Sequence, residues 1–220
     1  MLRPDAIFYQ MKPSPFRRGF KKDAEAESIA VRRSLKISPN AACPAREVAR
    51  LYEVIVSPAQ CLEGLVETVL SDEFPDKQLV ADRMAWLLRP NGEFSAIVAI
   101  IKEHKMVLYN AAHSPARQES DIMHELAHII LKHPGDCLQL NADLGLRRFN
   151  VQHEEEAKWL GATLQIPDQG LFAHIKAGLS NQDIAEIYGA SLEMVTFRRR
   201  TLGIDTRLYR LRNFSRQSSI

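Results

Sequence analysis

The chain has 220 residues, of which 45% are hydrophobic, so it can bury a core and is not an intrinsically disordered protein. Its formal net charge is only +2, and its cysteines are odd in number and lack Cys-x-x-Cys spacing, which argues against a disulfide framework and favours a reducing compartment. The sequence contains no stretch typical of a signal peptide or a membrane span, so we expect a cytoplasmic protein without membrane contact. The cysteines are predicted to be core thiols: Cys43, Cys61 and Cys137.

Basic residues are concentrated at the two ends of the chain. Lysine and arginine outnumber aspartate and glutamate in residues 1–36 and again in residues 193–220, whereas acidic residues are in excess between them. Several prolines interrupt residues 1–22, so we expect a flexible basic extension there and a basic tail over residues 207–220. Basic ends also suit an anionic partner such as DNA, which is kept as an alternative partner.

The first half of the chain is expected to contain helices and one hairpin. Apolar periodicity predicts helices over residues 23–36, 44–52 and 61–70. Residues 94–101 and 105–109 are rich in β-branched side chains and are joined by a short polar segment, which predicts a β-hairpin. His104 is placed in its turn, and His113, just beyond the hairpin, is interpreted as a loop residue that has the alternative role of assisting a substrate or transition state.

Residues 124–128 read His-Glu-Leu-Ala-His within a helix whose two ends are marked in the sequence. Ser114-Pro115 provides an N-cap followed by a proline at the first helical position, and residues 132–135 supply cations and then a helix breaker. Two histidines four residues apart share a helix face and can bind one metal ion at about 2.0 to 2.1 Å from each ring nitrogen. Glu125 points about 100° away from the first histidine, which suits a general base rather than a ligand.

This helix is predicted to be buried except for one polar face. Such a face suits the floor of an active-site cleft, and it is formed by Arg117, Asp121, His124, Glu125 and His128. His133 lies five residues after His128, and a continued helix would turn it about 140° away. It is therefore interpreted as a residue that stabilises the end of the helix and not as a third ligand.

A catalytic zinc site needs a third protein ligand. Residues 150–167 read as a second helix, capped by Asn150 and ended by a proline, with acidic residues in its first turns. On a helical wheel Glu154 lies beside a stripe of small residues that would let this helix pack closely on another. Glu154 is therefore the favoured third ligand, and Glu156 and His153 are the alternatives.

Residues 180–203 have the spacing of a helix-turn-helix. Ser180 and Ser191 cap two short helices, and Gly189 permits the turn between them. Ala185 allows close packing and Val195 buries the second helix against the first. That helix is expected to expose a set suited to phosphate contact: Glu193, Thr196, Arg199 and Arg200.

Two of these segments together resemble the ImmA/IrrE family of metallo-endopeptidases. They are residues 114–128, Ser-Pro-Ala-Arg-Gln-Glu-Ser-Asp-Ile-Met-His-Glu-Leu-Ala-His, and residues 154–167, Glu-Glu-Glu-Ala-Lys-Trp-Leu-Gly-Ala-Thr-Leu-Gln-Ile-Pro. The resemblance covers roughly residues 25–206. In that family the first glutamate of the second segment supplies the third metal ligand, and it maps onto Glu154. The chain departs from the family pattern in ways that remove no ligand, at Lys158, at residues 159–161 and at residues 122–123.

The resemblance implies an α+β, mostly helical fold, with a zincin-like metallopeptidase domain over residues 23–175 that contains a small β-hairpin or sheet. A helix-turn-helix-like subdomain is expected over residues 176–206. Members of the family commonly carry such a segment after the metal site, which implies a structural or substrate-docking subdomain in preference to a sequence-specific DNA reader. Zn²⁺ is the implied cofactor, and the implied substrate is a partner protein, a transcriptional repressor.

The implied mechanism is attack of a zinc-bound water on a peptide carbonyl, with Glu125 as the general base. The hairpin over residues 94–109 is the candidate edge for binding the substrate backbone, and a purely structural hairpin is the alternative. A DNA-binding regulator or antitoxin-like module with a vestigial metal site is the alternative function, which the intact ligands and base disfavour.

Overall fold

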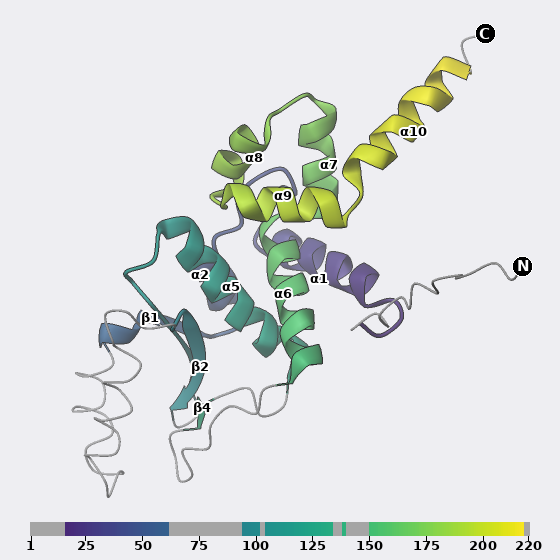
Figure 1. The fold of residues 1–220 in the computed structure, drawn as a ribbon. Helices are drawn as coiled ribbons and strands as arrows, with labels where there is room; N and C mark the ends of the chain where they lie inside the picture. The colour runs from purple at the N-terminus through teal and green to yellow at the C-terminus, as the bar shows by residue number, and fades with distance from the viewer. Residues whose placement is uncertain (1–15, 62–93, 102–103, 134–137, 140–149, 218–220) are drawn as a thin grey trace, which may run out of the picture.

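The structure is a computed structural model that describes residues 16–61, 94–101, 104–133, 138–139 and 150–217. These residues form a mostly helical α+β fold with one small sheet (Figure 1). The helices are α1 (Phe20–Ser34), α2 (Ala45–Leu51), the short 3-10 helix η1 (Ala59–Cys61), α5 (Pro115–Leu131), α6 (Val151–Gln165), α7 (Asp168–Lys176), α8 (Asn181–Tyr188), α9 (Leu192–Thr201) and α10 (Ile204–Gln217). The strands are β1 (Ile55–Pro58), β2 (Ala96–Ile101), β3 (His104–Tyr109) and β4 (Leu138–Gln139).

The sheet is built around the predicted hairpin, which is confirmed. Its strand order is β1-β3-β2-β4, with β2 and β3 antiparallel and the outer strands each parallel to their neighbour. His104, expected in the turn, is instead the first residue of β3 and pairs with Ile101, because the connection is only two residues long. The middle of the hairpin is fully buried, as Val98 and Val107 show, so the sheet belongs to the core.

Helices α5 and α6 pack against each other next to the sheet (Figure 1). The opposite side of α6 contacts α1, and α5 also contacts α2, β2 and β3. The close approach of α5 and α6 depends on Gly161, because a Cβ atom there would lie 3.2 Å from the carbonyl oxygen of Met123 and 3.3 Å from the backbone of His124. The small-residue stripe predicted on α6 is therefore a helix-helix contact.

The ordered fold begins earlier than the sequence suggested. Helix α1 starts at Phe20 rather than at residue 23, and Phe20 is buried in the core. The ring of Phe16 stacks on Phe20, with centroids 5.2 Å apart, and meets the edge of Trp159 at 5.5 Å. The prediction of a flexible extension through residue 22 is therefore wrong for residues 16–22, because two aromatic side chains anchor this basic stretch.

The C-terminal helices surround a second apolar core. Residues from α7 to α10, among them Leu171, Ile184, Val195 and Leu208, pack together in it. The predicted domain boundary after residue 175 divides this core, because Leu171 and Ile175 of α7 belong to it. Residues 207–217 of the predicted basic tail are helical and reach outward from the other helices (Figure 1).

Two further predictions are only partly covered. The helix expected over residues 61–70 lies outside the described residues except for Cys61, which ends η1. Cys43 is buried as expected, whereas Cys61 is exposed, and both are free thiols; Cys137 lies outside the described residues. In the part of the chain that the structure describes, no helix combines the length and apolar character needed to span a bilayer.

Candidate metal centre

Helix α5 presents the predicted polar residues from a largely apolar helix. It begins as predicted, with Ser114 in an extended N-cap conformation and Pro115 at the first helical position. The middle of its apolar face is fully buried, from Ile122 to Ala127, and Glu125 and His128 are buried with it, at 3% and 2% exposure, while His124 is half-buried. Burying two ionisable side chains without a metal ion or a hydrogen-bond partner would cost free energy, so the groups around Glu125 and His128 indicate their role.

Helix α6 brings Glu154 to the same place. The side chain of Asn150 caps the helix as predicted, accepting hydrogen bonds from the backbone N–H groups of Gln152 and His153 at 2.9 and 3.3 Å. Glu154 and Gly161 are seven residues apart and therefore lie almost on the same face of the helix, which is the face in contact with α5. The close contact at Gly161 thus directs Glu154 toward the histidines of α5.

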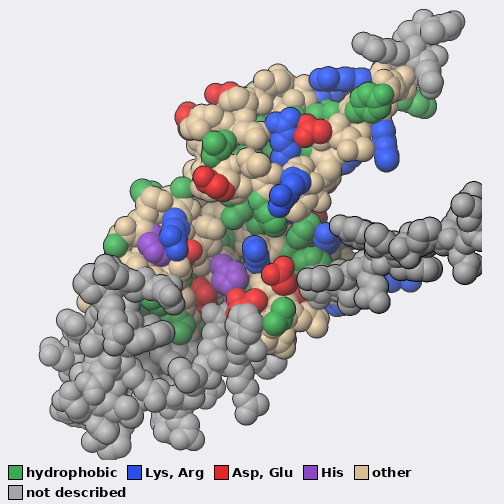
Figure 2. Space-filling model, in the orientation of Figure 1, with side chains coloured by type: hydrophobic (Ala, Val, Ile, Leu, Met, Phe, Trp, Pro, Cys, Tyr) green, Lys and Arg blue, Asp and Glu red, His purple; other side chains and the backbone are tan. Residues whose placement is uncertain are grey.

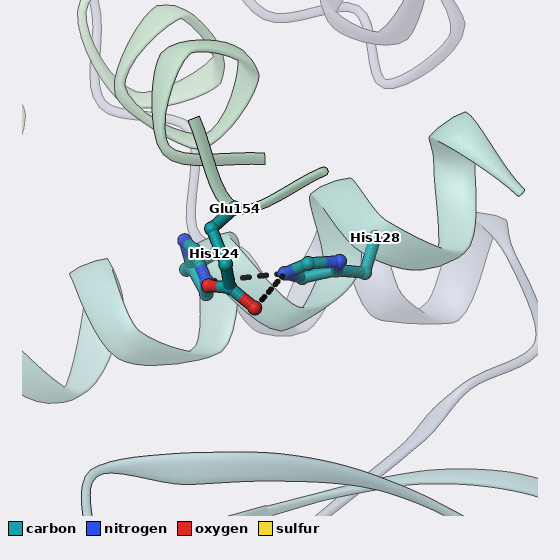
Figure 3. Close-up of side chains that lie close together, drawn as sticks. All are labelled: His124, His128 and Glu154. Carbon is teal, nitrogen blue, oxygen red and sulfur yellow. Dashed lines mark hydrogen bonds and ion pairs between the residues drawn. The ribbon is translucent and has the colours of Figure 1, made fainter. Parts of the chain in front are cut away.

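The three predicted ligands converge from these two helices (Figure 3). Nε2 of His124 lies 3.2 Å from Nε2 of His128 and 3.2 Å from a carboxylate oxygen of Glu154, and His128 Nε2 lies 3.7 Å from the other oxygen. Ligands of a tetrahedral zinc ion at 2.0 to 2.1 Å lie about 3.3 Å from one another. The donor set and its spacing therefore fit a metal ion; that these residues bind one stays a prediction.

Glu125 does not join this group but lies beside it. A cavity of about 280 Å³ adjoins it, lined by Phe94, Ser95, Ala96, Asp121, His124 and Glu125. A carboxylate oxygen of Glu125 accepts a hydrogen bond from the backbone N–H of Val98 in β2 at 3.2 Å. This contact, which no sequence pattern indicated, orients the buried carboxylate at the edge of the cavity.

The edge of β2 that faces this cavity has backbone groups available for pairing. The carbonyl of Ser95 accepts from Asn110 N–H across the hairpin, so by the alternation of antiparallel pairs the backbone groups of Ala96 and Val98 point to the other side. The bond from Val98 to Glu125 agrees with this direction. Within the described residues, β4 pairs only with Ala99 and Ile100, so the first half of β2 has no strand beside it on the edge that faces away from β3.

The structure places His113 next to the N-terminal part of α5. Its Nδ1 lies 2.7 Å from a carboxylate oxygen of Asp121, and both side chains are mostly buried, at 14% and 17% exposure. Arg117 reaches Asp121 at 3.8 Å and donates to the hydroxyl of Ser95 at 3.3 Å. His113 is therefore part of a polar cluster that connects α5 to the start of β2, a connection that its loop position did not indicate.

His133 turns back toward the metal centre. Helix α5 ends at Leu131, and Lys132 adopts the left-handed conformation with φ of 55°. The chain reverses there, so His133 does not point away from His128 as it would in a continued helix, and its Nδ1 lies 3.0 Å from Nδ1 of His128. Glu156, an alternative third ligand in the sequence, contacts His133 instead, and the ring of His153 stacks on that of His133.

Helices α8 and α9 have the predicted caps and turn. Ser180 and Ser191 cap them, and Gly189 is left-handed with φ of 61°. Arg199, expected to be exposed, is half-buried and binds Asp205 at 2.6 Å and Asn181 at 2.8 Å. Acidic side chains lie among the basic ones on this part of the surface (Figure 2). The helix therefore presents less free positive charge than its sequence suggests.

Comparison with known proteins identifies one family. The model of Peptidase M78, described as IrrE N-terminal-like domain, matches residues 88–200, slightly more than half of the chain. The match spans the hairpin, both helices of the candidate metal centre and the α8–α9 pair, and it confirms the resemblance found in the sequence over a narrower range than residues 25–206. No curated protein matches the chain.

Proposed function

Because the chain belongs to the Peptidase M78 family of metallopeptidases, with an IrrE N-terminal-like domain, we propose that it is a zinc-dependent endopeptidase. The substrate we propose is one specific partner protein, a transcriptional repressor, and the proposed location is the cytoplasm, in keeping with cysteines that lack disulfide spacing. The observation that supports the proposal most is the convergence of His124, His128 and Glu154, which is the His₂Glu set typical of a catalytic zinc site.

In the proposed reaction, the zinc ion and Glu125 have separate roles. A bound zinc ion would supply Lewis-acid activation of a water molecule and of the peptide carbonyl. Glu125 is the proposed general base, which takes the proton of the attacking water and delivers it to the leaving amine. Its carboxylate suits this task because Val98 N–H holds it at the cavity wall, beside the half-buried ring of His124.

The substrate backbone is proposed to pair with β2. Ala96 lines the same cavity as His124 and Glu125, and within the described part of the chain its outward backbone groups are free for this pairing, whereas the N–H of Val98 is held by Glu125. An extended peptide added at this edge would run past the metal centre, and its carbonyl groups would come close to Glu125. This arrangement favours a substrate segment that is extended or locally unfolded over one held in a helix.

The proposal is tested by metal content and by new protein termini. We expect the purified full chain to hold about one zinc ion per molecule. Cleavage is measured by labelling the N-termini formed when a lysate of the source cells is incubated with the protein. Termini formed by the unaltered chain are expected to be absent with Glu125→Gln, which keeps the shape of the side chain but cannot take a proton.

Glu155→Gln is the matched control, because Glu155 lies on α6 outside the converging set. It should give the same termini as the unaltered chain. Equal sets of termini from the unaltered chain and from Glu125→Gln, or a chain that holds no zinc, would contradict the proposed function.

A further inference from the structure

Further polar side chains lie on the side of His128 that faces away from the other two candidate ligands, His124 and Glu154. Nδ1 of His128 lies 3.0 Å from Nδ1 of His133, and Nε2 of His133 lies 3.2 Å from a carboxylate oxygen of Glu156. The amide of Gln152 donates to the other oxygen of Glu156 at 2.9 Å. The side chains of His128, His133 and Glu156 are only 2%, 5% and 11% exposed, so little water competes for these bonds.

The direction of each hydrogen bond follows from the role of His128 as a candidate metal ligand. Its Nε2 faces His124 and Glu154, and a neutral imidazole that offers Nε2 to a metal carries its proton on Nδ1. With a metal ion on Nε2, that proton would be donated to Nδ1 of His133, and the proton of His133 would then be on Nε2, where the carboxylate of Glu156 accepts it. Each side chain thus fixes the tautomer of the next.

The backbone and a neighbouring ring hold His133 in this position. The left-handed Lys132 lets the N–H of His133 donate to the carbonyl of His128 at 3.1 Å, while Lys132 N–H donates to Ile129, as in a Schellman motif. The ring of His153 stacks on that of His133, with centroids 4.3 Å apart and planes at 7°. The ring of His133 is therefore restrained at its backbone, at its face and at its outer nitrogen.

We propose that His133 and Glu156 are positioning residues, which set the tautomer and the ring orientation of His128 and thereby strengthen metal binding. The inference rests on the proposed function, since it requires His128 to be a ligand. Outer partners of a ligating histidine typically contribute 10- to 100-fold to metal affinity. Here the carboxylate acts through an intervening histidine rather than directly, so both residues are needed for the effect.

Two substitutions of His133 separate positioning from space filling. His133→Phe keeps a ring of similar size that can stack on His153, but it removes the acceptor for His128. His133→Asn is smaller, yet its side-chain oxygen lies near the place of Nδ1 and can accept the same proton. Glu156→Gln tests the contact with His133 by removing the charge, and Glu155→Gln on the same helix is its control.

The measurements use the metal alone. Zn²⁺ affinity of the full-length variants is obtained by competition with a chromophoric chelator, and the visible absorption of the Co²⁺ form reports the geometry at the ligands. We expect His133→Phe to weaken Zn²⁺ binding about 10- to 100-fold and to change the Co²⁺ spectrum. His133→Asn should recover most of the affinity and the original spectrum, and Glu156→Gln should weaken binding while Glu155→Gln does not.

The positioning role is overturned if His133→Phe binds Zn²⁺ as tightly as the unaltered chain, or if His133→Phe binds Zn²⁺ more tightly than His133→Asn does. If the metal-free His133→Phe variant fails to fold, as judged by circular dichroism, an unchanged Zn²⁺ affinity of Glu156→Gln overturns the proposal in its place. If the unaltered chain and all these variants bind Zn²⁺ at the site equally well, the positioning role is contradicted but the proposed function is not. A chain that binds no Zn²⁺ contradicts both.

Discussion

The metal centre and the C-terminal helices are held in place by different forces. Around the metal centre, α5 and α6 pack through apolar and small side chains, and the contact at Gly161 allows almost no extra atom. The C-terminal helices have their own apolar core, and although Leu202 also packs against the main core, several of their contacts with the rest of the fold involve charged side chains. Arg198, which is 0% exposed, binds Glu25 at 2.6 Å and the carbonyl of Ile166 at 2.9 Å.

Other contacts at this junction are also polar. Beside the junction, the guanidinium of Arg32 in α1, 1% exposed, donates to four backbone carbonyls, and those of Leu164 and Gln165 lie at the end of α6, just before α7. The hydroxyl of Tyr188 donates to the carbonyl of Pro39 at 2.8 Å. Tight apolar packing fixes atoms to a fraction of an ångström, as a metal site requires, whereas charge pairs set the position of a whole subdomain. Substitutions should therefore affect metal binding and attachment separately.

The largest effect is expected at a ligand and should leave the fold unchanged. Glu154→Gln replaces the only charged member of the ligand set, and we expect zinc affinity to fall about 1000-fold, which corresponds to ~4 kcal/mol. Chelator competition measures the affinity, and thermal unfolding of the metal-free protein should not change. Glu155→Gln is the control, and an equal loss of affinity in both variants would show that charge on α6, and not ligation, is responsible.

The next effect should be on stability and not on the metal. Glu25→Ala leaves the buried guanidinium of Arg198 without its carboxylate, which we expect to cost about 3 kcal/mol, whereas Arg198→Met should cost less because the carboxylate that remains, Glu25, is partly exposed and still accepts from Asp168 N–H. Urea unfolding measures both, and zinc affinity of the folded variants should be unchanged. An Arg198→Met variant that is less stable than Glu25→Ala would contradict the expected ranking of their stabilities.

A substitution at the helix contact should affect stability and metal binding together. Gly161→Val pushes α6 away from the backbone of Met123 and His124, with an expected cost of about 2 kcal/mol from overpacking. Because Glu154 lies on the same face of α6, zinc affinity should fall as well. Gly161→Ala should give a smaller change of the same kind. Loss of stability with full zinc affinity would argue against the coupling.

The smallest effect concerns alkaline pH at the junction. Burial raises the pKa of Tyr188 to about 12, and the nearby charge of Arg32 opposes this only in part. The unfolded tyrosine ionises near pH 10, so its contribution to stability is fully present below pH 10 and is lost as the pH rises toward 12. Tyr188→Phe should lose about 1 kcal/mol at neutral pH with its hydrogen bond, and its stability should fall less steeply above pH 10. Unfolding curves at several pH values measure this difference. If the free energy of unfolding falls equally steeply above pH 10 in Tyr188→Phe and in the unaltered chain, ionisation of Tyr188 is not responsible.

The sequence predicted the two central helices and the convergence of their polar residues. Caps and breakers act locally, so Ser114, Pro115 and Asn150 could be recognised without knowledge of the fold. The side of α6 that carries Glu154 followed from the period of small residues, because helical geometry places Glu154 and Gly161 on one face.

The remaining contacts could not be predicted, because they depend on distant residues or on backbone reversals. Lysine rarely adopts the left-handed conformation, so nothing in the sequence indicated that Lys132 would return His133 to His128. The bond from Val98 to Glu125 joins residues 27 positions apart through a backbone group that has no sequence pattern. Phe16 and Phe20 were obscured by the basic residues around them, whose charge suggested a solvated extension.

The central claim, that α5 and α6 form a zinc site, is tested most directly by anomalous scattering. Crystals of the zinc-loaded full chain, measured at the zinc absorption edge, should show one strong peak at about 2.0 to 2.1 Å from Nε2 of His124, Nε2 of His128 and a carboxylate oxygen of Glu154. A peak bound by other residues, or zinc-loaded crystals without a peak between these helices, would contradict the account.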